Sequence, residues 1–328
     1  MKIAEYRQYL QSQGLPADAI EQRLALVGEF VRFLADLAPA GGVADAGKGE
    51  AERFARRLIA EGRNTPANFA LLRDYAEWLG QRKLTVALIE MMDCCNALEV
   101  LAEKVEAGRG PQARARIFPE PLPPLGADEV ERCAYTRAAM ERMAREMTPQ
   151  QARAAWFQVQ HGIPAESWRA RDLAAREQFR RCGEDIDAYL DLRRRERDAL
   201  LTRLRDEGAL WHTMAVSDEV LAYVQANPEI GVGRREGDRI YFSRVPYDLP
   251  RYLRETDPTM KRYYACHCLL LREAIRQGRA LSPDVCHCSL GHASHNLAGL
   301  GLELRGEVLE SAVQGDLRCR FVFYLSQL

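Results

Sequence analysis

The chain has 328 residues, of which 47% are hydrophobic and 28% charged. This composition is ordinary for a globular protein and excludes wholesale disorder and collagen-like repeats. Its 46 Lys and Arg residues nearly balance 47 Asp and Glu residues, giving a formal net charge of −1, so bulk charge does not point to a nucleic-acid partner. The length suggests about two domains.

The chain contains neither an apolar run long enough to span a membrane nor the apolar core of a signal peptide at its first residues. We therefore expect no membrane partner and a cytoplasmic location. In that reducing compartment, nine cysteines are thiols or metal ligands rather than disulfides.

The first part of the chain, residues 1–107, reads as a helical domain. Apolar residues recur at helical spacing over 24–34, 69–79 and 84–105. Thr65 followed by Pro66 is typical of a helix start, with threonine as the N-cap and proline at the first helical position.

A proline-rich stretch, residues 108–127, follows. Such a density of proline favours a stiff extended linker, which we take as the domain boundary. Helical patterns resume over 128–146, 148–159 and 185–207.

The remainder of the second domain, 128–328, mixes strands and helices. Two β-hairpins are predicted, one around the turn at 236–238 and one around 314–316. Helices are predicted over 266–277 and 292–300. The fold class is therefore α+β: an all-helical N-terminal domain precedes a C-terminal domain with an antiparallel sheet, built from hairpins, packed against helices.

Soft ligands gather near the C-terminus, where five of the nine cysteines and four of the six histidines follow residue 265. They include two Cys-His-Cys triplets, at 266–268 and 286–288. Two such units could hold one tetrahedral zinc. Copper(I) or an iron–sulfur cluster would also accept sulfur ligands.

The local backbone decides which cysteines can share an ion. In an extended segment residues i and i+2 face the same side, whereas in a helix they diverge by about 200°. A helix over 266–277 favours Cys268 and Cys288, with Cys319 as the third ligand. The secondary metal candidates are Cys266, Cys286 and Glu310.

Two other interpretations of these residues stay open. One is a nucleophilic thiol without metal, at Cys268 or Cys288, activated by a neighbouring histidine such as His287. The other is a set of small buried thiols with a packing role only. Residues that could line a ligand pocket are His161, His267, His292 and Tyr264.

Four segments, at 261–268, 286–289, 308–311 and 315–321, resemble the L-2-amino-thiazoline-4-carboxylic acid hydrolase-like proteins, and within them an uncharacterised branch that carries the doubled Cys-His-Cys. The closing Glu…Gly-Asp-x-x-Cys-x-Phe pattern is similar to the 4-vinyl reductase domain, a small-molecule-binding α+β module that holds zinc in some sensor proteins. The resemblance implies that the family's cysteines match Cys268, Cys288 and Cys319.

Three functions follow as hypotheses. The leading one is a metal-thiolate protein, with zinc, that binds a small molecule and hydrolyses a cyclic amide or a thiazoline-like substrate. The alternatives are a ligand sensor whose helical domain binds a partner or a second copy in a homodimer, and a cysteine-nucleophile enzyme without metal.

The N-terminal helices are also similar to the DNA-contacting domain of tyrosine recombinases. The chain shows no domain with the arginine, histidine and tyrosine catalytic set of those enzymes. We therefore do not expect a nucleic-acid partner.

Overall fold

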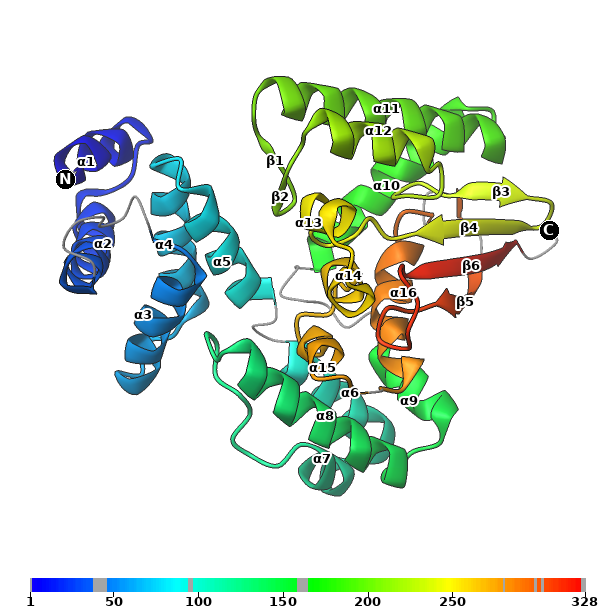
Figure 1. The fold of residues 1–328 in the computed structure, drawn as a ribbon, viewed down its shortest axis with the longest axis horizontal. Coiled ribbons are helices and arrows are strands. Elements are labelled where there is room, and N and C mark those ends of the chain that lie inside the picture. The colour runs from blue at the N-terminus through cyan, green and yellow to red at the C-terminus, as the bar shows by residue number, and fades with distance from the viewer. Residues whose placement is uncertain are drawn as a thin grey trace. The chain divides into compact units, whose positions relative to one another are not determined.

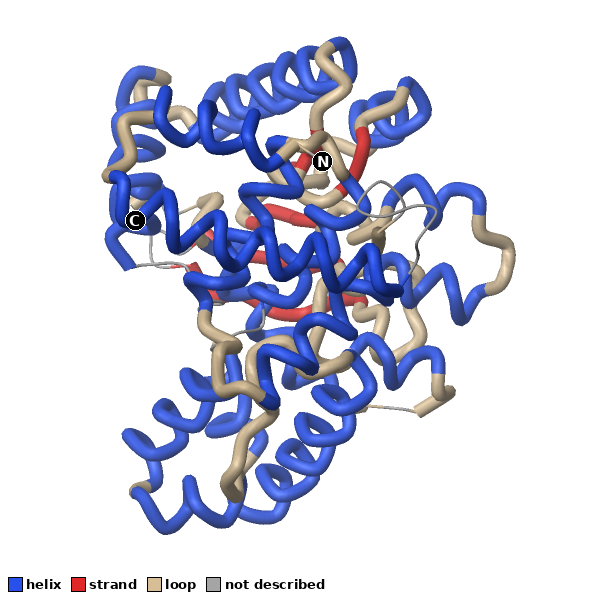
Figure 2. Tube along the Cα trace, turned by 90° about the vertical axis from the view of Figure 1, so that its left-hand side faces the viewer, coloured by secondary structure: helices blue, strands red, loops and turns tan. Residues whose placement is uncertain are grey.

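The computed structural model describes residues 2–37, 46–93, 97–157, 165–279, 281–297, 300–301 and 304–325. The chain is α+β, and Figure 2 shows that helix predominates and that strand is confined to a few short segments. It divides into two compact units, which we call unit 1 (residues 1–98 and 121–132) and unit 2 (99–120 and 133–328). None of the described helices is long and apolar enough to cross a membrane.

Unit 1 is helical, as the sequence predicts. Thr65 caps its fourth helix by accepting a hydrogen bond from the backbone N–H of Asn68 at 3.2 Å, and Pro66 occupies the first helical position. Phe30, Phe54 and Phe69 are fully buried in its core. The helices are α1 (Ile3–Ser12), α2 (Ala17–Leu37), α3 (Lys48–Ala60), α4 (Pro66–Trp78) and α5 (Arg82–Asp93).

Unit 2 holds most of the remaining helices, two of which, α6 and α8, begin within unit 1. In chain order they are α6 (Ala97–Arg109), α7 (Pro111–Ile117), α8 (Glu129–Glu146), α9 (Pro149–Trp156), α10 (Ala165–Arg181), α11 (Ile186–Asp206), α12 (Asp218–Ala226), α13 (Leu249–Arg254), α14 (Pro258–Ala265), α15 (Arg272–Arg276), the 3-10 helix η2 (Pro283–Cys286) and α16 (His287–Ser294).

The main sheet of unit 2 is antiparallel, with strand order β3-β4-β6-β5. Its strands are β3 (Arg234–Glu236), β4 (Arg239–Ser243), β5 (Leu304–Glu310) and β6 (Arg320–Leu325); β1 (Leu210–Trp211) and β2 (Met214–Ala215) form a separate pair. Both predicted hairpins are confirmed, as β3–β4 and β5–β6. Pairing of β4 with β6 joins them into one sheet.

Helix α16 packs against this sheet, as Figure 1 shows. The approach is close at Gly306 of β5, where a Cβ atom would stand 2.9 Å from the Leu290 Cδ1 atom and 3.0 Å from the Phe323 ring. A glycine at this position lets the helix carrying one Cys-His-Cys triplet lie directly on the strands.

The prediction of an extended linker over 108–127 is wrong for much of that range. Helix α6 continues to Arg109, and Pro111 starts α7. Proline has no N–H to donate, but the first turn of a helix needs none, so proline at the first position is compatible with helix. The compact units also divide the chain at different places from the predicted boundary.

The prediction of a helix over 266–277 is also wrong for the first half of that range. Asp257 caps α14 by accepting from the Met260 N–H at 2.8 Å, so that helix starts earlier and ends at Ala265. Cys266 is extended, and helix resumes only at Arg272. Likewise the helix predicted over 292–300 is α16, which begins at His287 and ends at Ser294.

Candidate thiol site

Four of the predicted cysteines come together in unit 2, and we call them the thiol cluster: Cys266, Cys286, Cys288 and Cys319. Cys286 lies within electrostatic reach of the other three. They come from the end of α14, the η2–α16 segment and the start of β6. The described cysteines are all free thiols.

Two members of the cluster are held against the loop that follows β5. The Cys286 Sγ atom lies 3.0 Å from the Ser311 hydroxyl, and the Ala312 N–H donates to the Cys319 thiol. Burial is the main reason that the pKa of both Cys286 and Cys319 lies above the ordinary thiol value. These two cysteines are therefore protonated at neutral pH.

Cys288 has a different environment. It is half-buried rather than buried, and it is the second residue of α16, which continues directly from η2. It also lies within electrostatic reach of Lys104 on α6 and of Arg244 after β4. Nearby cations are surroundings in which proteins stabilise a thiolate.

Arg244 connects the sheet with this cluster. Its backbone N–H donates to the Cys319 carbonyl at 3.0 Å. Its guanidinium Nη2 lies 3.2 Å from the Nδ1 atom of His267, whose Nε2 lies 2.5 Å from the Val245 carbonyl. Because arginine can only donate, Nδ1 accepts and the Nε2–H donates to the carbonyl.

The charge state of this pair follows from burial. Burial, followed by the nearby Arg244 charge, puts the pKa of His267 well below its ordinary value, so the imidazole is neutral. Arg244 remains a cation because a guanidinium keeps its proton in proteins, although burial lowers its pKa too. Its Nε atom is shut off from water and has no partner among the described residues. A desolvated cation thus lies beside the thiols.

The structure also gives contacts for the other predicted site residues. Cys268 is half-buried, and its carbonyl accepts from the Arg272 N–H at 2.8 Å. Both carboxylate oxygens of Glu310 are bound by Arg318, at 2.7 and 2.8 Å. A metal at Glu310 would have to break that ion pair.

Three histidines and one tyrosine were also predicted as site residues. The Nδ1 atom of His287 lies 3.2 Å from the Asp284 carbonyl, and His292 is half-buried on α16. Tyr264 stacks under Arg251, with 5.8 Å from the guanidinium to the ring centroid. His161 lies outside the described residues.

Within the part of the chain that the structure describes, no three His, Cys, Asp or Glu side chains are arranged to hold a metal ion. The cluster brings thiols within electrostatic reach of one another, but their sulfur atoms do not converge on one point. Its first triplet is extended rather than helical, so the geometric argument for Cys268 over Cys266 loses its premise.

Sequence reasoning missed Arg244 and Lys104. Arg244 could have been found from the sequence, because it continues the alternation of the buried residues Ile240 and Phe242 along β4. A charged residue at an inward-facing position is a candidate functional residue. No sequence pattern indicated Lys104, because only tertiary packing brings α6 to the cluster.

No family model matches the chain, and neither the curated proteins nor the solved structures contain a match.

Proposed function

We propose that unit 2 binds a small molecule at the thiol cluster and that Cys288 is its reactive thiol. The observation that carries this proposal is the position of Cys288: half-buried, in the first turn of α16, and near the cations Lys104 and Arg244. The buried Cys286 and Cys319 frame the site as neutral thiols. We also propose a cytoplasmic location, on the basis of the sequence pattern alone.

The reaction class is nucleophilic hydrolysis of a small amide or related C–N bond. The Cys288 thiolate adds to the electrophilic carbon, and the C–N bond breaks as the nitrogen takes up a proton from a water molecule. The resulting hydroxide then hydrolyses the thioester, which releases the acid and regenerates the thiolate. Arg244 is a desolvated donor close to the thiol, which suits it to stabilise the negative charge that develops on the carbonyl oxygen. The likeness to thiazoline hydrolase-like proteins is consistent with this class.

Alkylation by iodoacetamide, followed by peptide mass mapping on the full chain, tests the assignment. Cys288 should react at least about tenfold faster than Cys286 or Cys319, because only a thiolate is nucleophilic. Replacing Lys104 by Gln should slow the reaction at Cys288 and leave that at Cys182 unchanged. Faster alkylation of Cys286 or Cys319 than of Cys288 would refute the proposal.

Zinc binding by the thiol cluster is the second candidate function. It is favoured by the position of Cys286, which lies near three other cysteines. It requires the thiol side chains to turn toward a common point. The test is metal content per chain on protein purified without chelator. About one zinc per chain, with thiols protected until chelation, would support it; absence of metal together with one fast thiol would favour nucleophilic Cys288.

A further inference from the structure

A cavity of about 210 Å³ opens in unit 2 where α12, β3 and β4 meet. A volume of that size corresponds to about seven water molecules at ~30 Å³ each, enough for a small organic molecule. Its polar lining comes from Tyr223, Asn227, Glu229, Arg234, Ser243, Arg244 and Arg318. Three of these seven carry a positive charge and one carries a negative charge.

The single carboxylate in the lining is already engaged. Arg320, which is outside the lining, donates to both oxygens of Glu229 at 2.7 and 2.8 Å. The Ser243 hydroxyl donates a further hydrogen bond at 2.9 Å. Glu229 is therefore matched to Arg320, while Arg318 and Arg234 pair with Glu310 and Glu236. Over the described ranges, Arg244 is the lining arginine that has no carboxylate partner.

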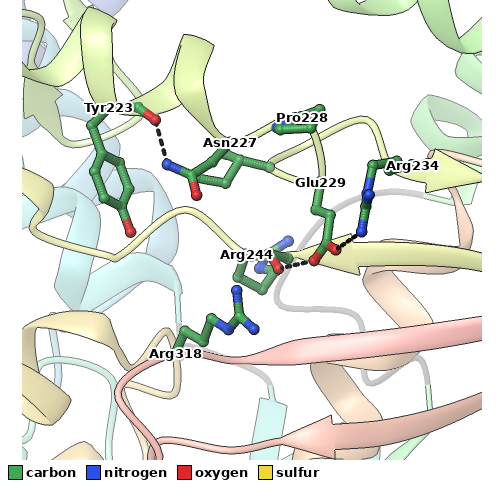
Figure 3. A pocket seen from close by; sticks show the side chains of 9 residues that line it. Tyr223, Asn227, Pro228, Glu229, Arg234, Arg244 and Arg318 are labelled. Atoms are coloured by element: carbon green, nitrogen blue, oxygen red, sulfur yellow. Dashed lines mark hydrogen bonds and ion pairs between the residues drawn. The ribbon is translucent and has the colours of Figure 1, made fainter.

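Two of the lining arginines retain unused donors. Arg318 donates from its Nε and Nη2 atoms to Glu310. Arg234 forms ion pairs through its Nη2 atom with Glu236 and Glu229. Over the described ranges, neither Arg318 Nη1 nor the Nε and Nη1 atoms of Arg234 have a protein partner. In Figure 3 the guanidinium of Arg318 and the ring of Tyr223 extend toward the same space.

Tyr223 adds no opposing charge. Burial, followed by the neighbouring Tyr252, raises the pKa of its phenol to about 12, so it is neutral at physiological pH. The Asn227 side chain is fixed by donating to the Tyr223 carbonyl at 2.7 Å. Tyr223 and Asn227 therefore add neutral polar groups to the lining.

We propose that this cavity binds the oxyanion group, a carboxylate or a phosphate, of a small molecule. Guanidinium donors match the planar or tetrahedral oxygens of those groups and gain strength from the opposite charge. The cavity adjoins the thiol cluster through Arg318, which precedes Cys319 in the chain. The inference does not depend on the reactivity of Cys288.

Isothermal titration of the full chain at low ionic strength tests the proposal, with inorganic phosphate and benzoate as separate probes. Saturable binding of phosphate alone identifies a phosphate site, and of benzoate alone a carboxylate site; binding of both shows that the oxyanion is the shared determinant. Arg318→Gln and Arg234→Gln should each weaken binding by about tenfold or more, as expected for losing a charge-assisted donor.

Arg305→Gln is the matched control, because that side chain is 79% exposed on β5 and pairs with Glu307. It should change the affinity by less than about twofold. If Arg318→Gln fails to fold, as judged by circular dichroism, Arg234→Gln decides, since its side chain is 46% exposed. Lack of saturable binding of both probes, or equal weakening by Arg234→Gln and Arg305→Gln, overturns the proposal.

Discussion

Glu229, which precedes β3, forms a largely buried ion pair with Arg320 at the start of β6, and Glu229→Gln tests the contribution of this pair to stability. Both oxygens of Glu229 accept from Arg320, and the two side chains are only 12% and 20% exposed. Glutamine keeps the size and one acceptor but turns an N–H₂ group toward the guanidinium.

The expected loss follows from that geometry. Breaking a fully buried pair from one side destabilises a protein by about 3–5 kcal/mol. This pair retains some exposure, and glutamine retains one hydrogen bond, so we expect about 2–3 kcal/mol. With a urea slope of roughly 2–3 kcal/mol/M, the unfolding midpoint should fall by about 1 M.

Urea unfolding at pH 7, followed by far-UV circular dichroism, is the assay, and Glu307→Gln is the control. Glu307 pairs with Arg305 at 2.9 Å, but those side chains are 43% and 79% exposed. An exposed pair contributes at most about 1 kcal/mol. Equal midpoints for the two variants would refute the reasoning.

A double variant checks the cause. If the loss comes from leaving Arg320 without its bidentate partner, adding Arg320→Gln to Glu229→Gln should cost less than Arg320→Gln does alone. Additive losses would show that the two side chains act independently.

Three further predictions concern a cap, a close contact and an acid-sensitive pair. Thr65→Ala removes the side-chain cap of α4 and should destabilise unit 1 by about 1 kcal/mol in urea unfolding; an unchanged midpoint would contradict the capping role. Gly306→Ala places a methyl group 2.9 Å from Leu290 Cδ1 and should cost about 1–3 kcal/mol by the same measurement; a stabilised variant would show that α16 can move away. The hydrogen bond from Arg318 lowers the pKa of Glu310, so this carboxylate contributes stability above its ordinary pKa that is lost as pH falls through the lowered value. Between pH 6 and pH 3 the midpoint temperature of thermal unfolding should therefore fall more steeply in the wild type than in Glu310→Gln. Parallel curves of midpoint against pH would exclude this contribution.

Local chemistry made much of the fold readable from the sequence. Helical periodicity in residues 24–34, the Thr65-Pro66 start and the turns at 236–238 and 314–316 act within a few residues of chain. Their outcomes match the structure because these signals depend mainly on residues close in the chain. The concentration of cysteines after residue 265 likewise pointed to the region where the thiol cluster lies.

Errors arose where two local rules competed. Pro111 counted toward an extended linker by composition, yet its position at the start of α7 is compatible with helix. The apolar pattern over 266–277 suggested one helix, but the Asp257 cap starts α14 upstream and leaves Cys266 extended. In both cases a capping position outweighed average composition.

Sequence alone determined the residue types that could do chemistry: a pair of Cys-His-Cys triplets near the C-terminus of an α+β chain. Only the tertiary structure decided which of them meet and what charge surrounds them. Lys104 precedes Cys288 by more than 180 positions in the chain, and Arg244 directly follows β4. Burial and charge depend on every element packed nearby, so the environment of a thiol is a property of the fold, whereas its presence is a property of the sequence.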